Sequence, residues 1–118
     1  MKRKPMEKER RSAPRVRVNL PARWEGVLHH ETATITDLSR TGCFVLTGGK
    51  VEVKELIYLE IDIEQKEPLH LWAEVVDEAS EIGFALRFNS SSIEDEKRLA
   101  SFIEECFKIQ ATKKSDEN

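Results

Sequence analysis

Two short motifs contain the residues best suited to ligand chemistry. Arg11 and Arg15 lie just before the first alternating segment, and Asp37, Ser39 and Gly42 follow the second. A guanidinium is a planar fork that binds a phosphate, or the O6 and N7 atoms of guanine, through two hydrogen bonds. Carboxylate and hydroxyl oxygens accept hydrogen bonds, here from the N1–H and exocyclic amine of guanine. Together the motifs predict a site for an anionic guanine nucleotide.

The charge distribution supports an anionic ligand near the N-terminus. The chain of 118 residues has a net charge of −3. Residues 1–24 contain nine Lys and Arg but only two Glu, so this segment carries +7 and the remainder −10. A basic segment attached to an acidic body favours an anionic partner at that segment. The acidic body argues against nucleic-acid binding, which needs a wider basic face.

The length suits one domain, which we divide into residues 1–9 as a flexible basic arm, residues 10–109 as the folded domain and residues 110–118 as a polar tail. No apolar run approaches the ~18 residues of a membrane-spanning helix, so membrane insertion is not expected. The basic N-terminus lacks the apolar core of a signal peptide, which favours a cytoplasmic protein. Cys43 and Cys106 are interpreted as small core residues.

The spacing of apolar residues predicts strands. From Arg15 to Trp24 apolar and polar side chains alternate, which is typical of a half-buried strand. Similar segments separated by turn residues follow at 31–36, 42–46, 56–63, 69–77 and 82–88. Six short strands at this spacing indicate a mainly β fold, a closed or nearly closed antiparallel barrel.

A C-terminal helix is predicted after the last strand. Residues 89–92 offer capping side chains, and acidic residues follow them, as is typical of a helix start. An apolar stripe at three-four spacing runs from Leu99 to Phe107. We expect this stripe to be buried against the barrel surface, over Trp72 or Val76.

The order of the motifs, RxxxR from Arg11 to Arg15 and then DxSxxG, resembles the double signature of PilZ domains. These are small β-barrels that bind the bacterial second messenger cyclic di-GMP. The resemblance covers residues 10–88, with a helix after it, and no motif position is substituted. Segments 16–21 and 83–88 match the strand after the second arginine and the last strand.

The resemblance implies a role for each motif residue. Arg11 and Arg15 would grip the phosphates and guanine edges of cyclic di-GMP, and Asp37 and Ser39 would hold a guanine on the barrel. Gly42 would allow close approach, because a Cβ there would collide with the ligand or the turn.

The residue before the first motif arginine is Arg10. In this family that position is associated with ligand stoichiometry. An arginine there resembles members that take up two stacked cyclic di-GMP molecules, since a third guanidinium can stack on a guanine.

Simpler interpretations exist for each motif alone. The arginines could be a solvated basic tail, and Asp37 and Ser39 could bond only to backbone in an ordinary turn. No catalytic constellation is recognisable, so no enzyme is expected. His29, His30 and His70 lack partners for a metal site, and no cofactor is predicted.

The resemblance also implies a signalling role without an output domain. The predicted protein, a monomer or weak dimer, would relay the signal to an unidentified effector protein by ordering of the N-terminal arm. Family members act in motility, exopolysaccharide secretion or biofilm control. The alternative is a protein–protein interaction adaptor, of the pilus or motility type, without nucleotide binding.

Overall fold

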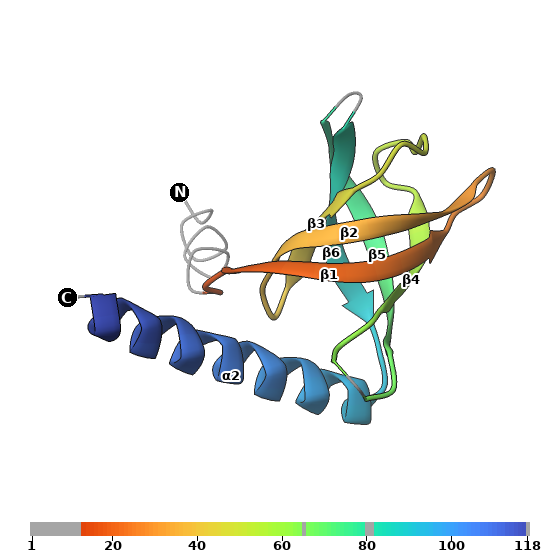
Figure 1. The fold of residues 1–118 in the computed structure, drawn as a ribbon. Helices are drawn as coiled ribbons and strands as arrows, with labels where there is room; N and C mark the ends of the chain where they lie inside the picture. Colours follow the sequence, from red (N-terminus) through yellow and green to blue (C-terminus); the bar gives the residue numbers. More distant parts are fainter. Residues whose placement is uncertain (1–12, 65, 80–81, 118) are drawn as a thin grey trace, which may run out of the picture.

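Six antiparallel strands form a closed barrel (Figure 1). The structure, a computed structural model, describes residues 13–64, 66–79 and 82–117. The strands follow the order β1-β2-β3-β6-β5-β4 around the barrel, and β1 pairs with β4 to close it. Their bounds are β1 (Val16–Glu25), β2 (His30–Leu38), β3 (Gly42–Leu46), β4 (Leu56–Ile61), β5 (Leu69–Ala79) and β6 (Gly83–Ser90). The predicted six-stranded antiparallel barrel is confirmed.

The core fills the barrel with the apolar face of each strand. In β4, Ile57, Leu59 and Ile61 are buried while the alternate residues face outward, as the alternation predicts. Trp24 of β1 packs edge-on against Phe84 of β6, with ring centroids 5.2 Å apart. These contacts place the polar faces of all six strands on the outer surface, where a ligand or partner can reach them.

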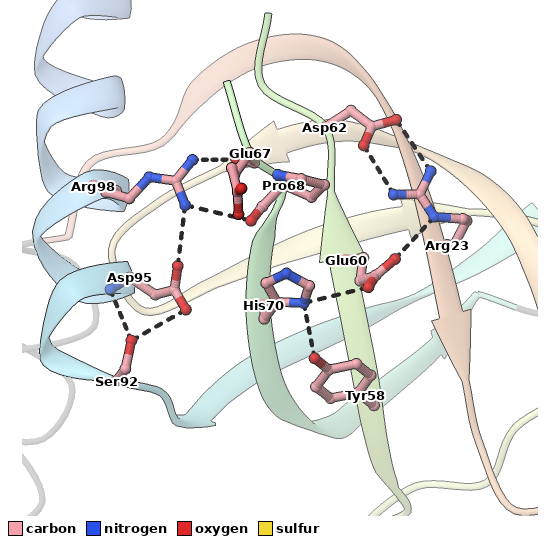
Figure 2. A network of polar contacts seen from close by, with 10 residues as sticks. All are labelled: Arg23, Tyr58, Glu60, Asp62, Glu67, Pro68, His70, Ser92, Asp95 and Arg98. Atoms are coloured by element: carbon pink, nitrogen blue, oxygen red, sulfur yellow. Dashed lines mark hydrogen bonds and ion pairs between the residues drawn. The ribbon is translucent and has the colours of Figure 1, made fainter. Parts of the chain in front are cut away.

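An arginine joins the two strands whose pairing closes the barrel. Arg23 of β1 donates from Nε to Glu60 Oε1 at 3.0 Å and from Nη2 to Asp62 Oδ1 at 2.9 Å (Figure 2). Nη1 donates to the second oxygen of Asp62 at 3.1 Å. Fork-to-carboxylate geometry of this kind fixes both partners. Glu60 of β4 and Asp62, which directly follows β4, therefore connect this strand to β1.

The helix α2 (Ile93–Glu117) crosses one end of the barrel (Figure 1). The Ser92 hydroxyl caps its start by accepting from the Asp95 amide at 3.0 Å. Leu99 and Ile103 are buried in the same cluster as the barrel core. At the other end of the crossing, Gln110 Nε2 donates to the Arg17 carbonyl at 3.1 Å.

The expectation that the helix covers Trp72 or Val76 is wrong, because both side chains remain exposed. The reason lies in the anchoring of α2. Arg98 donates to the carbonyls of Glu67 and Pro68 in the β4–β5 connection, which holds the helix at the barrel end (Figure 2). Trp72 and Val76 belong to the outer face of β5, which the helix does not cover.

α2 continues to Glu117, into the segment for which the sequence predicts a polar tail. Residues 110–117 contain neither Gly nor Pro, so no residue there interrupts the helix. The predicted arm, residues 1–9, lies outside the described residues, and so do Arg10 and Arg11.

The Arg23 connection predicts an acid-dependent loss of stability. Hydrogen bonds from Arg23 lower the pKa of Asp62, so this carboxylate stabilises the fold fully above its unfolded pKa of about 3.9. That contribution is lost as the pH falls through the lower pKa of the folded state. Arg23→Gln should lower the free energy of unfolding at neutral pH by at most about 1 kcal/mol, because solvent screens this partly exposed pair.

The difference in the free energy of unfolding between Arg23→Gln and the wild type should become smaller below about pH 3.9. Urea unfolding across the acid range measures it. Arg17→Gln, which removes another exposed arginine of β1, is the matched control. An equal acid dependence in both variants would contradict the assignment to Asp62.

Candidate functional site

The DxSxxG motif forms the tight connection from β2 to β3. Ser39 is buried, with only 2% of its surface exposed, and its Oγ accepts hydrogen bonds from the amides of Thr41 and Gly42, both at 3.1 Å. The Ser39 amide donates to the Gly42 carbonyl at 2.9 Å. This is the local hydrogen bonding of an ordinary serine turn. The hydroxyl therefore fixes the backbone of the turn, whatever else it contacts.

Gly42 is required by the neighbouring strand. A Cβ at this position would lie 2.2 Å from the carbonyl oxygen of Leu86. Gly42 of β3 is paired with Arg87 of β6, so the two strands approach closely where the turn ends. Sequence reasoning expects the collision with the ligand or the turn, whereas the structure places it on β6. A contact between Gly42 and a ligand stays a prediction.

Arg15, the second arginine of the first motif, contacts Asp37 of the second motif. Arg15 Nη1 lies 3.1 Å from Asp37 Oδ1, in an ion pair whose side chains are 62% and 31% exposed. Asp37 lies in β2, between Arg17 of β1 and Phe44 of β3. Exposed pairs of this kind contribute at most about 1 kcal/mol, so an anionic ligand can replace the carboxylate at little cost.

An open cleft of about 590 Å³ adjoins the turn. It lies between the turn, the end of β6 and the start of α2, and its volume is in the usual range for small-molecule pockets, roughly 300–1,000 Å³. Among the residues that the structure describes, two cationic ones line it, Arg40 of the turn and Arg87 of β6. The remaining lining residues are Ala13, Pro14, Thr41, Leu71, Phe88, Asn89, Ser91, Glu96 and Leu99.

Sequence reasoning did not assign Arg40 and Arg87 to the site. Arg40 occupies an unspecified position of the DxSxxG motif, so the motif carries no signal for it. Arg87 has the outward parity of the last strand, but only the strand order shows that β6 lies beside β3. Arg87 Nη2 lies 3.0 Å from Glu74 Oε1 on the neighbouring β5. The site thus offers two further guanidinium groups near the predicted ligand residues.

The two cysteines and the possible metal ligands show no arrangement suited to chemistry. Burial raises the pKa of the Cys43 thiol, and burial together with nearby carboxylates raises that of Cys106, so neither favours the reactive thiolate. Within 13–64, 66–79 and 82–117, no three His, Cys, Asp or Glu residues are grouped as a metal site. No helix in the described part of the chain is long and apolar enough to cross a membrane.

Comparison with known proteins identifies similar sequences and folds. The family model described as PilZ domain matches residues 9–105. No curated protein matches the sequence. The PilZ domain of YcgR from Escherichia coli, solved with c-di-GMP, has 17% identity and a TM-score of 0.72, covering 92% of this chain and 99% of that chain.

Two longer solved proteins are similar to this chain over about half their own length. Bacillus subtilis MotI, described as an inhibitor of motility, has 18% identity and a TM-score of 0.69, covering 86% of this chain and 51% of that chain. The K. pneumonia MrkH–c-di-GMP complex has 15% identity and a TM-score of 0.68, covering 86% of this chain and 54% of that chain. At these identities the likeness establishes the shared barrel fold.

The close approach of β3 and β6 predicts a stability effect that is independent of any ligand. Gly42→Ala should lower the free energy of unfolding by about 1–3 kcal/mol, because the new methyl group must displace strand backbone. Gly48→Ala is the matched control, since nothing lies within 4 Å of a Cβ built there. Denaturant unfolding without nucleotide measures both, and equal stability of the two variants would contradict the steric explanation.

Proposed function

This chain belongs to the PilZ domain family, and from that premise we propose that it is a receptor for cyclic di-GMP. The observation that carries the proposal is the meeting of the two motifs, where Arg15 lies against Asp37 beside the turn held by Ser39. The solved YcgR domain and MrkH complex, both with c-di-GMP, support the choice of ligand class.

In the proposed complex Arg15 exchanges its Asp37 partner for the ligand. Arg11 and Arg15 bind the phosphates and the guanine edges, which leaves the Asp37 carboxylate free to accept from guanine N1–H and the exocyclic amine. Ser39 and Gly42 contribute at the same surface, by fixing the turn and by allowing close approach of the backbone. Among the three residues of the DxSxxG motif, Asp37 is therefore the one whose substitution least disturbs the turn.

The number of ligands depends on the cations available. Each cyclic di-GMP carries two phosphates, so a second stacked molecule needs further positive charge. Arg10 is proposed to supply it by stacking on a guanine. Arg40 and Arg87, which line the adjoining cleft, are placed to contribute to the same charge balance.

The signal is proposed to pass through the N-terminal arm. Ordering the backbone of each arm residue costs about 1–2 kcal/mol. Hydrogen bonds to charged groups contribute about 1.5–3 kcal/mol each and offset this cost. An arm ordered only with ligand would present a different surface to an effector protein. The proposed receptor acts in the cytoplasm as a monomer or weak dimer, without enzymatic activity, in motility or biofilm control.

The alternative function is a protein–protein interaction adaptor that binds no nucleotide. The local hydrogen bonds of Ser39 suit it, because the motif turn is complete without a ligand. The adaptor and receptor functions separate cleanly in a binding experiment.

Calorimetric titration at physiological salt tests the receptor. The intact protein should bind cyclic di-GMP, and the double variant Arg11→Ala/Arg15→Ala should lose binding. Asp37→Ala should weaken it roughly tenfold or more, since it removes a charge-assisted hydrogen bond of about 1.5–3 kcal/mol. Pyrophosphate, a phosphate-only probe, should bind Asp37→Ala no more weakly than the wild type, because the variant frees Arg15. A ratio of two cyclic di-GMP molecules per chain would support the role of Arg10.

Arg23→Gln removes an arginine near the other end of β1 and is the control for loss of a positive charge away from the motifs. No heat with the intact protein would favour the adaptor. Equal loss in Arg23→Gln and the double variant would indicate non-specific attraction to polyanions.

Hydrogen exchange tests the proposed relay. Amides in residues 8–16 should exchange more slowly when cyclic di-GMP is present, because ligand contacts fix the arm. Mass spectrometry of peptides from this segment measures the change, with the Leu56–Ile61 strand as an internal reference. Unchanged exchange in residues 8–16 at saturating ligand would rule out relay through the arm.

A further inference from the structure

An aromatic and aliphatic surface lies on the outer face of β4 and β5. We name it the β4–β5 patch, and it consists of Leu56, Tyr58, His70, Trp72 and Val76. Three of these side chains are large, apolar and well exposed, at 49% for Leu56, 47% for Trp72 and 41% for Val76. Exposed tryptophan and tyrosine are enriched in protein interfaces. Neither α2 nor a described loop covers them.

The aromatic side chains of the patch are held in place before any partner binds. The Tyr58 and Trp72 ring centroids lie 5.1 Å apart, and Tyr58 and Trp72 are directly paired across the two strands. The Tyr58 hydroxyl lies 2.8 Å from His70 Nδ1, which in turn lies 3.3 Å from Glu60 Oε2 (Figure 2). A preformed surface loses little side-chain entropy on binding.

The patch lies on the opposite side of the barrel from the motif turn. In the order β1-β2-β3-β6-β5-β4, β5 is three strands from β2 and β4 is three strands from β3. A partner on the β4–β5 patch would therefore leave the surface around Asp37 accessible. The inference thus does not rest on nucleotide binding.

Carboxylates predominate around the patch. Glu60 lies opposite His70 and Glu74 opposite Leu56 across the two strands, where their carboxylates pair with Arg23 and Arg87. Further acidic side chains lie exposed beyond them. The acidic residues of β1, β4, β5 and the loop before β4 are Glu25, Glu52, Glu55, Glu60, Glu74, Asp77 and Glu78, and the cations of these elements and of β6 are Arg17, Arg23, Lys50, Lys54 and Arg87. Acidic side chains attract cations, and the faces of the Tyr58 and Trp72 rings are suited to bind them.

We propose that the β4–β5 patch docks a basic amphipathic segment of another protein, an apolar row flanked by Lys or Arg. The apolar row would cover Leu56, Trp72 and Val76, and the basic side chains would reach the carboxylates. Recognition occurs through side chains, because each strand of the closed barrel already has two neighbours and offers no free edge.

The two other possible occupants fit less well. A second copy of this chain would place like-charged borders opposite each other, which is unfavourable. The chain's own residues 1–12 are basic, but Met1 and Met6 are their only large apolar side chains, too few to cover the patch. Both possibilities give distinct outcomes in the test below.

Trp72 provides the signal for the test. The chain has two tryptophans, and Trp24 is buried in the core, so binding at the patch changes chiefly the emission of Trp72. The probes are three synthetic peptides of five helical turns, roughly 18 residues. One has a leucine row flanked by lysines, one a leucine row flanked by glutamates, and one a serine row flanked by lysines.

The leucine–lysine peptide should bind in a saturable 1:1 complex, shift the Trp72 emission to shorter wavelength and protect it from acrylamide. The other two peptides should bind at least about tenfold more weakly, since one lacks the charge and the other the apolar row. Leu56→Ser and Val76→Ser should weaken binding of the first peptide similarly. Leu28→Ser, which removes an exposed leucine from the β1–β2 hairpin, should leave it unchanged.

Equal binding of all three peptides, or an equal loss in Leu28→Ser and Leu56→Ser, would overturn the proposal. A concentration-dependent blue shift of the emission of the protein alone, with a dimer in sedimentation, would show that a second copy of this chain occupies the patch. Greater acrylamide quenching of Trp72 after deletion of residues 1–11 would show that the chain's own N-terminal segment, and not another protein, occupies the patch.

Discussion

Closure of the barrel by pairing of β1 with β4 is the constraint on which the rest of the structure depends. Because every strand then has two neighbours, the apolar faces share one interior and all polar faces lie outside. The closed order also puts β3 beside β6, where a Cβ at position 42 would lie 2.2 Å from the Leu86 carbonyl oxygen. The motif turn, the cleft beside it and the β4–β5 patch are all outer-surface consequences of this one arrangement.

The sequence determines strands and faces well because burial imposes a period of two. The alternation from Val16 to Trp24 and along β4 predicts the inward face of both strands, although Val18 and Leu20 are only partly buried where the register of β1 shifts. The helix is also predicted, since a cap at Ser92 and a three-four apolar stripe are local patterns. Its place on the barrel is not, because that depends on Arg98 reaching carbonyls about thirty residues away. Local spacing carries no such information.

In the candidate site, too, local patterns are predictable from the sequence and contacts between distant strands are not. The motif order indicates that Arg15 and Asp37 belong together, and the structure places them in one ion pair. The contact of Gly42 with β6 could not be predicted, because it depends on which strand lies beside β3. The same holds for the cleft that brings Arg40 and Arg87 together. Ser39 illustrates a further point, since a residue named by a binding motif can be fully engaged in holding the backbone.

The ion pair between Arg87 and Glu74 joins two surfaces that otherwise lie apart. Arg87 lines the cleft beside the motif turn, whereas Glu74 lies on β5 next to Leu56 of the patch. An anion in the cleft that attracts Arg87 leaves Glu74 without its cation and adds a net negative charge at the patch border. Affinity of the patch for a basic segment would then rise, and by thermodynamic linkage that segment would raise the affinity of the cleft for the anion by the same factor. One exposed arginine can in this way couple the cleft and the patch across two neighbouring strands without movement of either strand.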